Sequence, residues 1–247
     1  MIDLKTINPL PPEDLDKSET QKLTLEMQQE ILQLQTLLLA NKKDSVLVIL
    51  QGMDASGKDG IIRDVFTGLN PTNCSIYSFK KPTELEFSYD FLWRIHQQVP
   101  LKGSIQVFNR SHYEDVLIQK VHQWITPEVC QKRYEAINHF ETLLENNHTH
   151  IIKCYLHVSP EKQLERLTER RDLKEEHYKH NDNDWKEREY WNAYQDAYHQ
   201  AFLNCNKTPW HIIPADKGWY KSYLVAELLL NTLKKLNMDF PDIKSEN

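Results

Sequence analysis

The prediction of the fold starts from Val46-Leu47-Val48-Ile49-Leu50-Gln51-Gly52-Met53-Asp54-Ala55-Ser56-Gly57-Lys58-Asp59-Gly60. Its first five residues are aliphatic, which is typical of a strand that is buried on both faces of a sheet. Gly52 to Lys58 match the pattern G-x-x-x-x-G-K, and apolar residues at helical spacing follow. A strand, a glycine loop and a helix in this order bind phosphate groups, because backbone N–H groups converge on the anion at the start of the helix.

Within this loop we expect Lys58 to reach the outer phosphates and the neighbouring backbone to surround them. The residues expected to bind phosphate are Gly52, Ala55, Ser56, Gly57, Asp59 and Gly60. Asp59 stands where most such loops have a Ser or Thr hydroxyl for Mg²⁺, so another oxygen must hold the metal. Asp54 is the candidate, because Mg²⁺ prefers hard oxygen ligands. The alternative is a glycine-containing turn with a surface lysine.

Composition limits the class of protein. The 247 residues are 40% hydrophobic and 27% charged, which fits one large α/β domain with a buried core. No apolar run is long enough to span a membrane, and the N-terminus lacks the apolar stretch of a signal peptide. Four widely spaced cysteines indicate free thiols in the cytoplasm. The net charge of −6 argues against a protein that binds polyanions over its whole surface, so an anion site must be a local basic patch.

Three regions are expected along the chain. Residues 1–16, which include three prolines, read as an extended arm, residues 17–240 as one domain that contains the glycine loop, and residues 241–247 as a disordered tail. The domain opens with a helix from Lys17, for which Ser18 is the candidate cap. Apolar residues at helical spacing favour a helix that packs on the core over a coiled-coil dimer arm. They are Leu23, Met27, Ile31, Leu34 and Leu38.

Five short apolar segments alternate with helical patterns, which predicts a parallel sheet with helices on both faces. The segments are 46–50, 74–79, 104–108, 150–158 and 210–213. The ligand site of such a sheet lies at the carboxyl ends of its strands. Single helices are expected over 84–96, from Thr126-Pro127-Glu128, from Ser159-Pro160-Glu161, and from about Trp219.

Charged residues follow two of these strands. Lys80 and Lys81 come after the second strand, where at least one is expected to contact an anion, the alternative being a solvated turn. Arg110 follows the third strand and has the planar fork that suits a phosphate. Glu114 or Asp115 would hold Mg²⁺, directly or through water. The alternative is that both acids only favour a helix start, with Ser111 as its cap.

Residues 172–184 are polar and nearly free of aliphatic side chains. Arginines flank them, with Arg166, Arg170 and Arg171 before and Arg188 after. This pattern predicts a mobile lid over about 166–195 that closes on phosphates and excludes water. The alternative is a solvated charged helix. With the glycine loop, the lid indicates phosphoryl transfer, in which positioning and charge neutralisation supply most of the catalysis. Asp54 could also orient or deprotonate the acceptor oxygen.

Several motifs in a fixed order are more specific than any single one. They are Gly52–Gly60, Gly68–Pro71, Ser78–Thr83, Asp90–Arg94, Phe108–Leu117, Glu187–Trp191 and Ile213–Asp216. In these motifs, over about residues 20–238, the sequence resembles the family-2 polyphosphate kinases, which use inorganic polyphosphate as phosphoryl donor to nucleotides. The form Phe108-Asn109-Arg110-Ser111-His112-Tyr113-Glu114 is most similar to the class that acts on both nucleoside monophosphates and diphosphates.

The resemblance implies a thymidylate-kinase-like α/β fold with a helical lid, a Mg²⁺ cofactor that Mn²⁺ can replace, and a homodimer or homotetramer. The implied substrates are polyphosphate with ADP or GDP, and also AMP; no nucleic acid or membrane partner is implied. Carried over by residue, Asp54, Lys58, Arg110 and Asp115 form the catalytic group, with Asp54 and Asp115 on the metal. The implied phosphate contacts are the lid arginines Arg170, Arg171 and Arg188. We further expect Lys80, Lys81, Arg94, Lys102 and Arg110 to hold the polyanion, and Glu114 to belong to the cofactor-binding residues. Rival hypotheses are an ATP-dependent nucleotide or small-molecule kinase and a phosphate-binding regulatory protein.

Overall fold

Five parallel strands form a single sheet at the centre of the computed structural model, which describes residues 4–242 apart from the side chain of Lys5. The strands are β1 (Ser45–Gln51), β2 (Cys74–Ser78), β3 (Ile105–Asn109), β4 (Thr149–His157) and β5 (Trp210–Pro214). Their order across the sheet is β2-β3-β1-β4-β5. All seven residues of β1 are buried. The predicted α/β fold with a five-stranded parallel sheet is confirmed.

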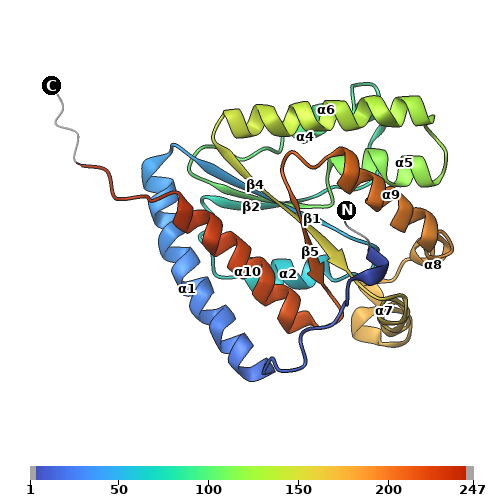
Figure 1. Cartoon of the computed structure of the whole chain (residues 1–247), viewed down its shortest axis with the longest axis horizontal. Coiled ribbons are helices and arrows are strands. Elements are labelled where there is room, and N and C mark those ends of the chain that lie inside the picture. Colours follow the sequence, from blue (N-terminus) through green and yellow to red (C-terminus); the bar gives the residue numbers. More distant parts are fainter. Residues whose placement is uncertain (1–3, 243–247) are drawn as a thin grey trace.

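Helices cover both faces of this sheet, which gives three layers (Figure 1). One face carries α1 (Lys17–Asn41), α2 (Lys58–Phe66) and α10 (Gly218–Lys235), with α1 packed along α10. The opposite side carries α4 (Trp93–His96), α6 (Pro127–Asn146) and α9 (Trp191–Asn204). The smaller elements are η1 (Leu4–Thr6), α3 (Glu84–Phe87), η2 (His112–Val116), α5 (Ile118–Val121), α7 (Pro160–Asp172), η3 (Lys174–Lys179) and α8 (Asp182–Arg188). No helix within residues 4–242 is long and apolar enough to cross a membrane.

The first helix packs on the core as expected, but two details of its prediction were wrong. The side chain that caps α1 is Asp16, which accepts a hydrogen bond from the Glu19 N–H at 2.8 Å, and not Ser18. Leu23 is 42% exposed, while Ile31 and Leu38 are fully buried. The buried face therefore includes polar residues that the apolar pattern did not mark, namely Thr20, Thr24 and Gln35.

The single helix expected over 84–96 is also wrong, because the structure has two short helices there, α3 and α4. Thr83 and Glu86 form a reciprocal capping box at the start of α3. The Asp90 side chain then accepts a hydrogen bond from the Leu92 N–H at 2.9 Å, which stabilises the turn between the two helices. The predicted starts of α6 and α7 are confirmed, with Thr126 and Ser159 as caps and a proline at the first position of each helix.

The N-terminal arm lies against the carboxyl ends of β4 and β5. Leu4 is buried, a His157 ring nitrogen lies 3.0 Å from the Ile7 carbonyl oxygen, and the Asp216 N–H donates to the Pro9 carbonyl at 3.1 Å. The arm is thus attached to the edge of the sheet where the site is expected. At the other end, residues 241 and 242 are exposed, and the rest of the predicted tail lies outside the described residues.

A buried ion pair connects the sheet to α6. The Lys153 ammonium on β4 donates to Glu141 Oε2 at 2.7 Å and to the Tyr113 hydroxyl at 2.9 Å, and both charged side chains are essentially unexposed. Tyr113 in turn donates to Glu141 Oε1 at 2.7 Å. His112, next to it, is fully buried, and burial lowers its pKa. This network fixes the position of η2, which carries Glu114 and Asp115.

We expect Lys153→Met to lower the free energy of unfolding by about 3 kcal/mol or more, because it leaves the Glu141 carboxylate buried without its cation. The double variant Lys153→Met/Glu141→Leu should recover most of this loss. Urea unfolding followed by circular dichroism measures both. Lys22→Met, which removes one partner of an exposed pair with Glu26, is the control and should change stability by less than about 0.5 kcal/mol. A loss below about 1 kcal/mol for Lys153→Met would contradict the assignment.

Candidate active site

The glycine loop connects β1 to α2 and takes backbone conformations that need small residues. Gly52 and Gly57 have φ angles of +150° and +98°, and Ala55 has a φ angle of +57°. A Cβ atom on Gly52 would lie 2.9 Å from the Leu156 carbonyl oxygen, which is too close for any side chain. The glycines therefore let the loop fold against β4 and direct its N–H groups toward one point.

The Lys58 side chain lies inside this loop. Its ammonium donates to the carbonyl oxygens of Gly52 at 2.8 Å and Met53 at 3.2 Å. Burial, and then the neighbouring Arg110, lower the pKa of Lys58 to about 8. An ammonium in this position is poorly solvated, so its charge is weakly screened and would attract a bound phosphate strongly.

Residues from two other helices support the loop from outside. The Arg166 guanidinium on α7 donates to the carbonyls of Ala55 and Ser56, both at 2.9 Å, and also to the carbonyls of Ala215 and Asp216 after β5. Gln163 on the same helix donates to the Asp54 carbonyl at 3.0 Å. The Gly52 N–H donates to the Tyr198 hydroxyl on α9 at 3.1 Å. The loop is thus held in place by hydrogen bonds to its own backbone.

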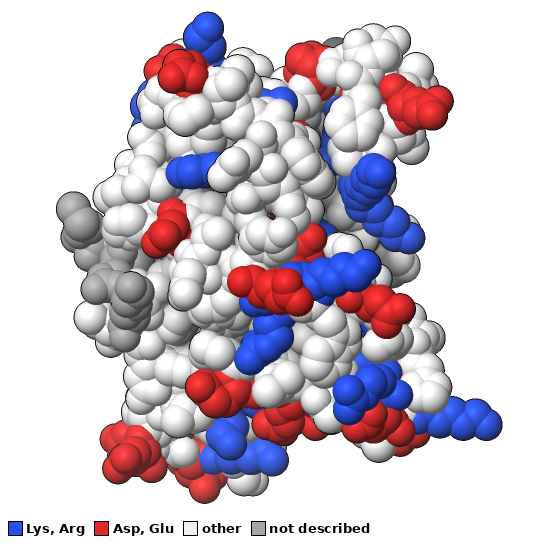
Figure 2. Space-filling model, turned by 90° about the vertical axis from the view of Figure 1, so that its right-hand side faces the viewer, with Lys and Arg blue, Asp and Glu red and all other residues white. Residues whose placement is uncertain are grey.

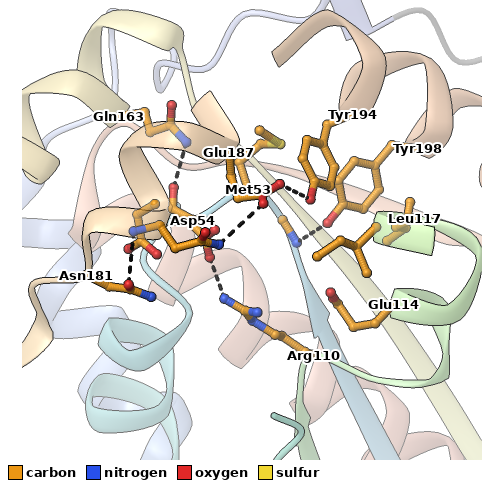
Figure 3. A pocket seen from close by; sticks show the side chains of 14 residues that line it. Met53, Asp54, Arg110, Glu114, Leu117, Gln163, Asn181, Glu187, Tyr194 and Tyr198 are labelled. Carbon is orange, nitrogen blue, oxygen red and sulfur yellow. Dashed lines mark hydrogen bonds and ion pairs between the residues drawn. The ribbon is translucent and has the colours of Figure 1, made fainter. Parts of the chain in front are cut away.

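Arg110 and Asp54 form an ion pair at the mouth of the loop, as Figure 3 shows. Arg110 has a φ angle of +64°, and its N–H donates to the Leu50 carbonyl at 3.0 Å, which turns its side chain toward the loop. The Asp54 carboxylate raises the pKa of Arg110 further, so its guanidinium stays charged. These two predicted residues are therefore brought together.

Two adjoining cavities meet at this pair. The first, here called the loop cavity, is lined by Lys58, Asp59, Arg110 and Arg170, among others. The second, the carboxylate cavity of Figure 3, is lined by Asp54, Arg110, Glu114, Asp184, Glu187 and Tyr194. Asp54, Arg110 and Asp184 line both, so a substrate could extend from one cavity into the other. The Asp59 carboxylate, within the loop cavity, accepts a hydrogen bond from the Asn109 amide at 2.9 Å.

The carboxylate cavity is short of positive charge. Asp184 on α8 is 92% buried, and burial together with the Asp54 carboxylate raises its pKa to about 6, although Arg170 pairs with it at 3.1 Å. Glu187 accepts hydrogen bonds from the Tyr194 hydroxyl at 2.7 Å and contacts a His122 ring nitrogen at 3.0 Å. Facing carboxylates of this kind favour a bound cation with hard character.

Asp115 lies elsewhere, away from both cavities. It is buried between Arg94 at 3.8 Å and Arg133 at 3.7 Å, and burial raises its pKa to about 6 against the effect of those arginines. Successive residues of a 3₁₀ turn point about 120° apart, so Glu114 faces the carboxylate cavity while Asp115 faces inward. The two expected metal ligands, Asp54 and Asp115, are thus not brought to one cavity.

Four further residues that were predicted to contact phosphate also lie away from both cavities. Lys80 and Lys81 are exposed and line neither cavity, and Arg94 is buried, where it donates to the Lys80 carbonyl at 2.8 Å. Lys102 precedes β3 and contacts the Asn147 carbonyl, which places it at the amino-terminal edge of the sheet, opposite the glycine loop. Its expected role at the site was therefore wrong.

The lid is more ordered than expected, because η3 and α8 replace the irregular excursion predicted over 172–184. Arg170 reaches the loop cavity. Arg171 points outward, where it pairs with Asp172 at 2.7 Å and lies over the Trp185 ring. Arg188 donates to the Pro160 carbonyl at 2.9 Å and to Gln163 Oε1 at 2.7 Å, which ties α8 to α7. Only Arg170 of the three predicted lid arginines lines a cavity at the loop.

A magnesium ion fits part of this arrangement. No three His, Cys, Asp or Glu side chains within residues 4–242 are grouped as ligands of one metal ion. Mg²⁺ in phosphoryl-transfer sites is bound through one or two carboxylates and by the substrate phosphates. Asp54, which lines both cavities beside the loop, fits that requirement, and Asp115 between its two arginines does not.

A comparison with protein families finds one whose match agrees with this glycine loop, its neighbouring carboxylates and the helical lid. The family model of Polyphosphate kinase 2 (PPK2) matches residues 14–241. The chain belongs to the polyphosphate kinase 2 family. A crystal structure of polyphosphate kinase 2 from Arthrobacter aurescens TC1 superposes with a TM-score of 0.95 at 38% identity, covering 100% of this chain and 90% of that one.

Two curated relatives cover most of the same length. The AMP/ADP-polyphosphate phosphotransferase of Meiothermus ruber is 47% identical over 210 residues, which are 84% of this chain and 79% of the relative. The ADP-polyphosphate phosphotransferase of Rhodopseudomonas palustris is 39% identical over 227 residues, 85% of this chain and 77% of the relative. The family expected from the sequence motifs is thereby confirmed.

Four residues of this polyphosphate kinase 2 chain at the site were not among the expected loop or metal-binding residues. Arg166 was noted only as a lid arginine, although it braces the loop. Asp184 was part of the polar segment 172–184, and Glu187 was the first residue of the motif Glu187–Trp191, to which no role at the site was given. Lys221, on the far helix α10, has its ammonium beside Gly57. An argument from neighbouring positions in the sequence cannot find a residue that arrives from a helix 160 positions later.

Gly52→Ala should lower the free energy of unfolding by roughly 2 kcal/mol, because the φ angle of +150° is strained for alanine and the Leu156 carbonyl cannot move aside. Phosphate binding should be lost with it. Gly218→Ala is the matched control, since nothing lies within 4 Å of the position and its φ is ordinary. Thermal unfolding with and without tripolyphosphate reports both effects. Equal stability of the two variants would refute the role of Gly52.

The pH dependence of substrate capture follows from Lys58. Its lowered pKa of about 8 means that the ammonium loses its charge as the pH rises through 8, well below the usual 10.5. We therefore expect kcat/KM for the phosphate-bearing substrate to fall above pH 8, because kcat/KM reports groups of the free enzyme. Circular dichroism at each pH separates this from unfolding. A kcat/KM that stays constant to pH 9.5 would contradict the assignment.

Proposed function

We propose that this enzyme transfers the terminal phosphoryl group of inorganic polyphosphate to nucleotides, converting ADP or GDP to ATP or GTP and also AMP to ADP. The observation that carries the proposal is the meeting of Lys58, Arg110 and Arg170 in one cavity at the glycine loop, next to the Asp54 carboxylate. Its support is membership of the polyphosphate kinase 2 family and the names of two relatives, which act on polyphosphate with ADP or AMP.

The side chains suit an in-line transfer without a covalent enzyme intermediate. Charge builds on the equatorial oxygens of the moving phosphoryl group, and the Lys58 ammonium with the Arg110 and Arg170 guanidiniums would neutralise it. Asp54 would hold or accept the proton of the acceptor oxygen and keep Arg110 in place. Since donor and product are both phosphoanhydrides, the same cationic groups serve the reverse reaction.

A magnesium ion, or manganese in its place, would supply neutralisation of the phosphate oxygens when bound. Asp54 is the residue that would hold it, with Glu114 and Asp184 within the same carboxylate cavity. Asp115 acts differently in this proposal. Its charge neutralises Arg94 and Arg133, and this holds η2 so that Glu114 faces the cavity. We also propose that the protein is cytoplasmic and assembles as a homodimer or homotetramer.

A matrix of donors and acceptors tests the function. Polyphosphate, ATP and no donor are each combined with AMP, ADP and GDP in the presence of Mg²⁺, and nucleotides are separated by chromatography. We expect new ADP, ATP and GTP with polyphosphate as donor, and loss of turnover when EDTA removes the metal. Turnover with ATP alone, and none with polyphosphate, would favour an ATP-dependent kinase instead.

Asp54→Asn tests the assigned carboxylate within that matrix. It should lower kcat at least hundredfold, because proton transfer and metal binding both need the charge. Asp239→Asn is the matched control, since Asp239 is exposed and makes its contact with Asn41 through the backbone carbonyl. Full activity in Asp54→Asn would remove this residue from the mechanism.

A further inference from the structure

A second lysine, Lys221, has its ammonium beside the glycine loop. Lys221 is the fourth residue of α10, and only 4% of its surface is exposed. Its ammonium makes no hydrogen bond or ion pair with any residue in the described part of the chain, 4–242. A buried ammonium costs free energy unless an anion neutralises it, so its position calls for a ligand.

The Lys221 ammonium points at the start of α2. A Cβ atom on Gly57 would lie 1.8 Å from Lys221 Nζ, and one on Gly60 would lie 3.4 Å from it. A side chain at position 57 would therefore collide with the ammonium, so the observed place of Lys221 depends on the glycine there. The first N–H groups of α2 are available to an anion at the same place, because no residue of an earlier turn accepts from them.

The nearby acid does not serve Lys221. The Asp64 carboxylate accepts hydrogen bonds from Arg63 at 2.7 Å and from the Ser222 hydroxyl at 3.1 Å. Its charge acts on Lys221 only at a distance, while burial and Arg166 lower the pKa of Lys221 to about 7. Burial above all, and then the neighbouring arginine, thus disfavours the charged form of Lys221, and a bound anion would stabilise that form.

A groove opens toward solvent beside Gly57 and Gly60, the two glycines next to the Lys221 ammonium. It is lined by Gly57, Asp59, Gly60, Arg63, Arg166 and Arg170, with Lys179 and three glutamates further out. Gly57, Asp59, Arg170 and Lys179 also line the loop cavity, so groove and cavity are continuous. Figure 2 shows the end of the molecule that carries the lid, where basic and acidic residues lie side by side on the surface.

We propose that Lys221 binds a non-transferred phosphate of the polyphosphate donor, which leaves the loop cavity over Gly57 and Gly60 and runs outward along this groove. The inference rests on the proposed function, because a chain of phosphates must continue beyond the unit that is transferred. Arg166 and Arg63 lie along the same groove, but their guanidiniums are already bonded to loop carbonyls and to Asp64. Lys221, whose ammonium lies next to the groove residues Gly57 and Gly60, has no side-chain hydrogen bond or ion pair to another residue within 4–242.

The test replaces the charge and leaves the catalytic residues in place. Lys221→Met keeps the length of the side chain, and Lys221→Gln keeps its polarity. Both should raise KM for polyphosphate about tenfold or more, because a charge-assisted contact is lost, and should leave KM for ADP within twofold. Lys235→Met, an exposed lysine at the far end of α10, is the matched control and should change neither value.

Two further measurements distinguish binding from a structural role. The logarithm of polyphosphate affinity should depend less steeply on salt in Lys221→Met, by about one unit of slope. The melting temperature without ligand should be equal to or above that of the wild type, since an unpaired buried charge is removed. A lower melting temperature with unchanged KM would show that Lys221 is structural and would overturn the proposal.

Calorimetry with inorganic tripolyphosphate separates this inference from the proposed function. If the wild type binds tripolyphosphate and Lys221→Met binds it at least tenfold more weakly, the site is supported even when no nucleotide is phosphorylated. Absence of turnover from polyphosphate in the wild type would defeat the proposed function alone. Equal tripolyphosphate affinity in Lys221→Met, Lys221→Gln and wild type would defeat the Lys221 site, whatever the turnover.

Discussion

The structure depends on holding desolvated cations around a glycine loop by bonds to backbone carbonyls. Lys58 is stabilised by two carbonyls of the loop, and Arg166 by four carbonyls of two loops. Such contacts satisfy the donors without cancelling their charge, since a carbonyl dipole neutralises much less than a carboxylate does. The positive potential therefore remains available for a phosphate. The arrangement requires glycines in the loop between β1 and α2 and keeps charged side chains buried, and both requirements lower the stability of the fold.

The sheet and the loop could be predicted because both follow from local patterns. Five apolar segments separated by helical patterns specify parallel strands, and Gly52, Gly57 and Lys58 lie within seven residues of each other. The helix caps at Thr126 and Ser159 were equally local. The errors arose where tertiary contacts outweigh pattern, as at α1, where Gln35 is buried because it bonds Asn70 and Asn73.

The site was predicted less completely, because its chemistry depends on side-chain direction. Glu114 and Asp115 are adjacent in sequence, yet one faces the carboxylate cavity and the other is buried with Arg94 and Arg133. The turn that separates them is fixed by Tyr113 and the buried Lys153–Glu141 pair, which come from other parts of the chain. The lid arginines illustrate the same limit of prediction. Their spacing in the sequence does not show that Arg170 faces the loop cavity while Arg171 points outward.

The bonds of Arg188 and Gln163 connect the glycine loop to α8. Arg188 donates to Gln163 on α7, and Gln163 donates to the Asp54 carbonyl, whereas Arg166 fastens the loop independently. A second Arg188 bond, to the Pro160 carbonyl, joins the same two helices. A displacement of α8 would therefore act on the Asp54 carbonyl through Gln163, while the carbonyl contacts of Arg166 would still hold the neighbouring part of the loop.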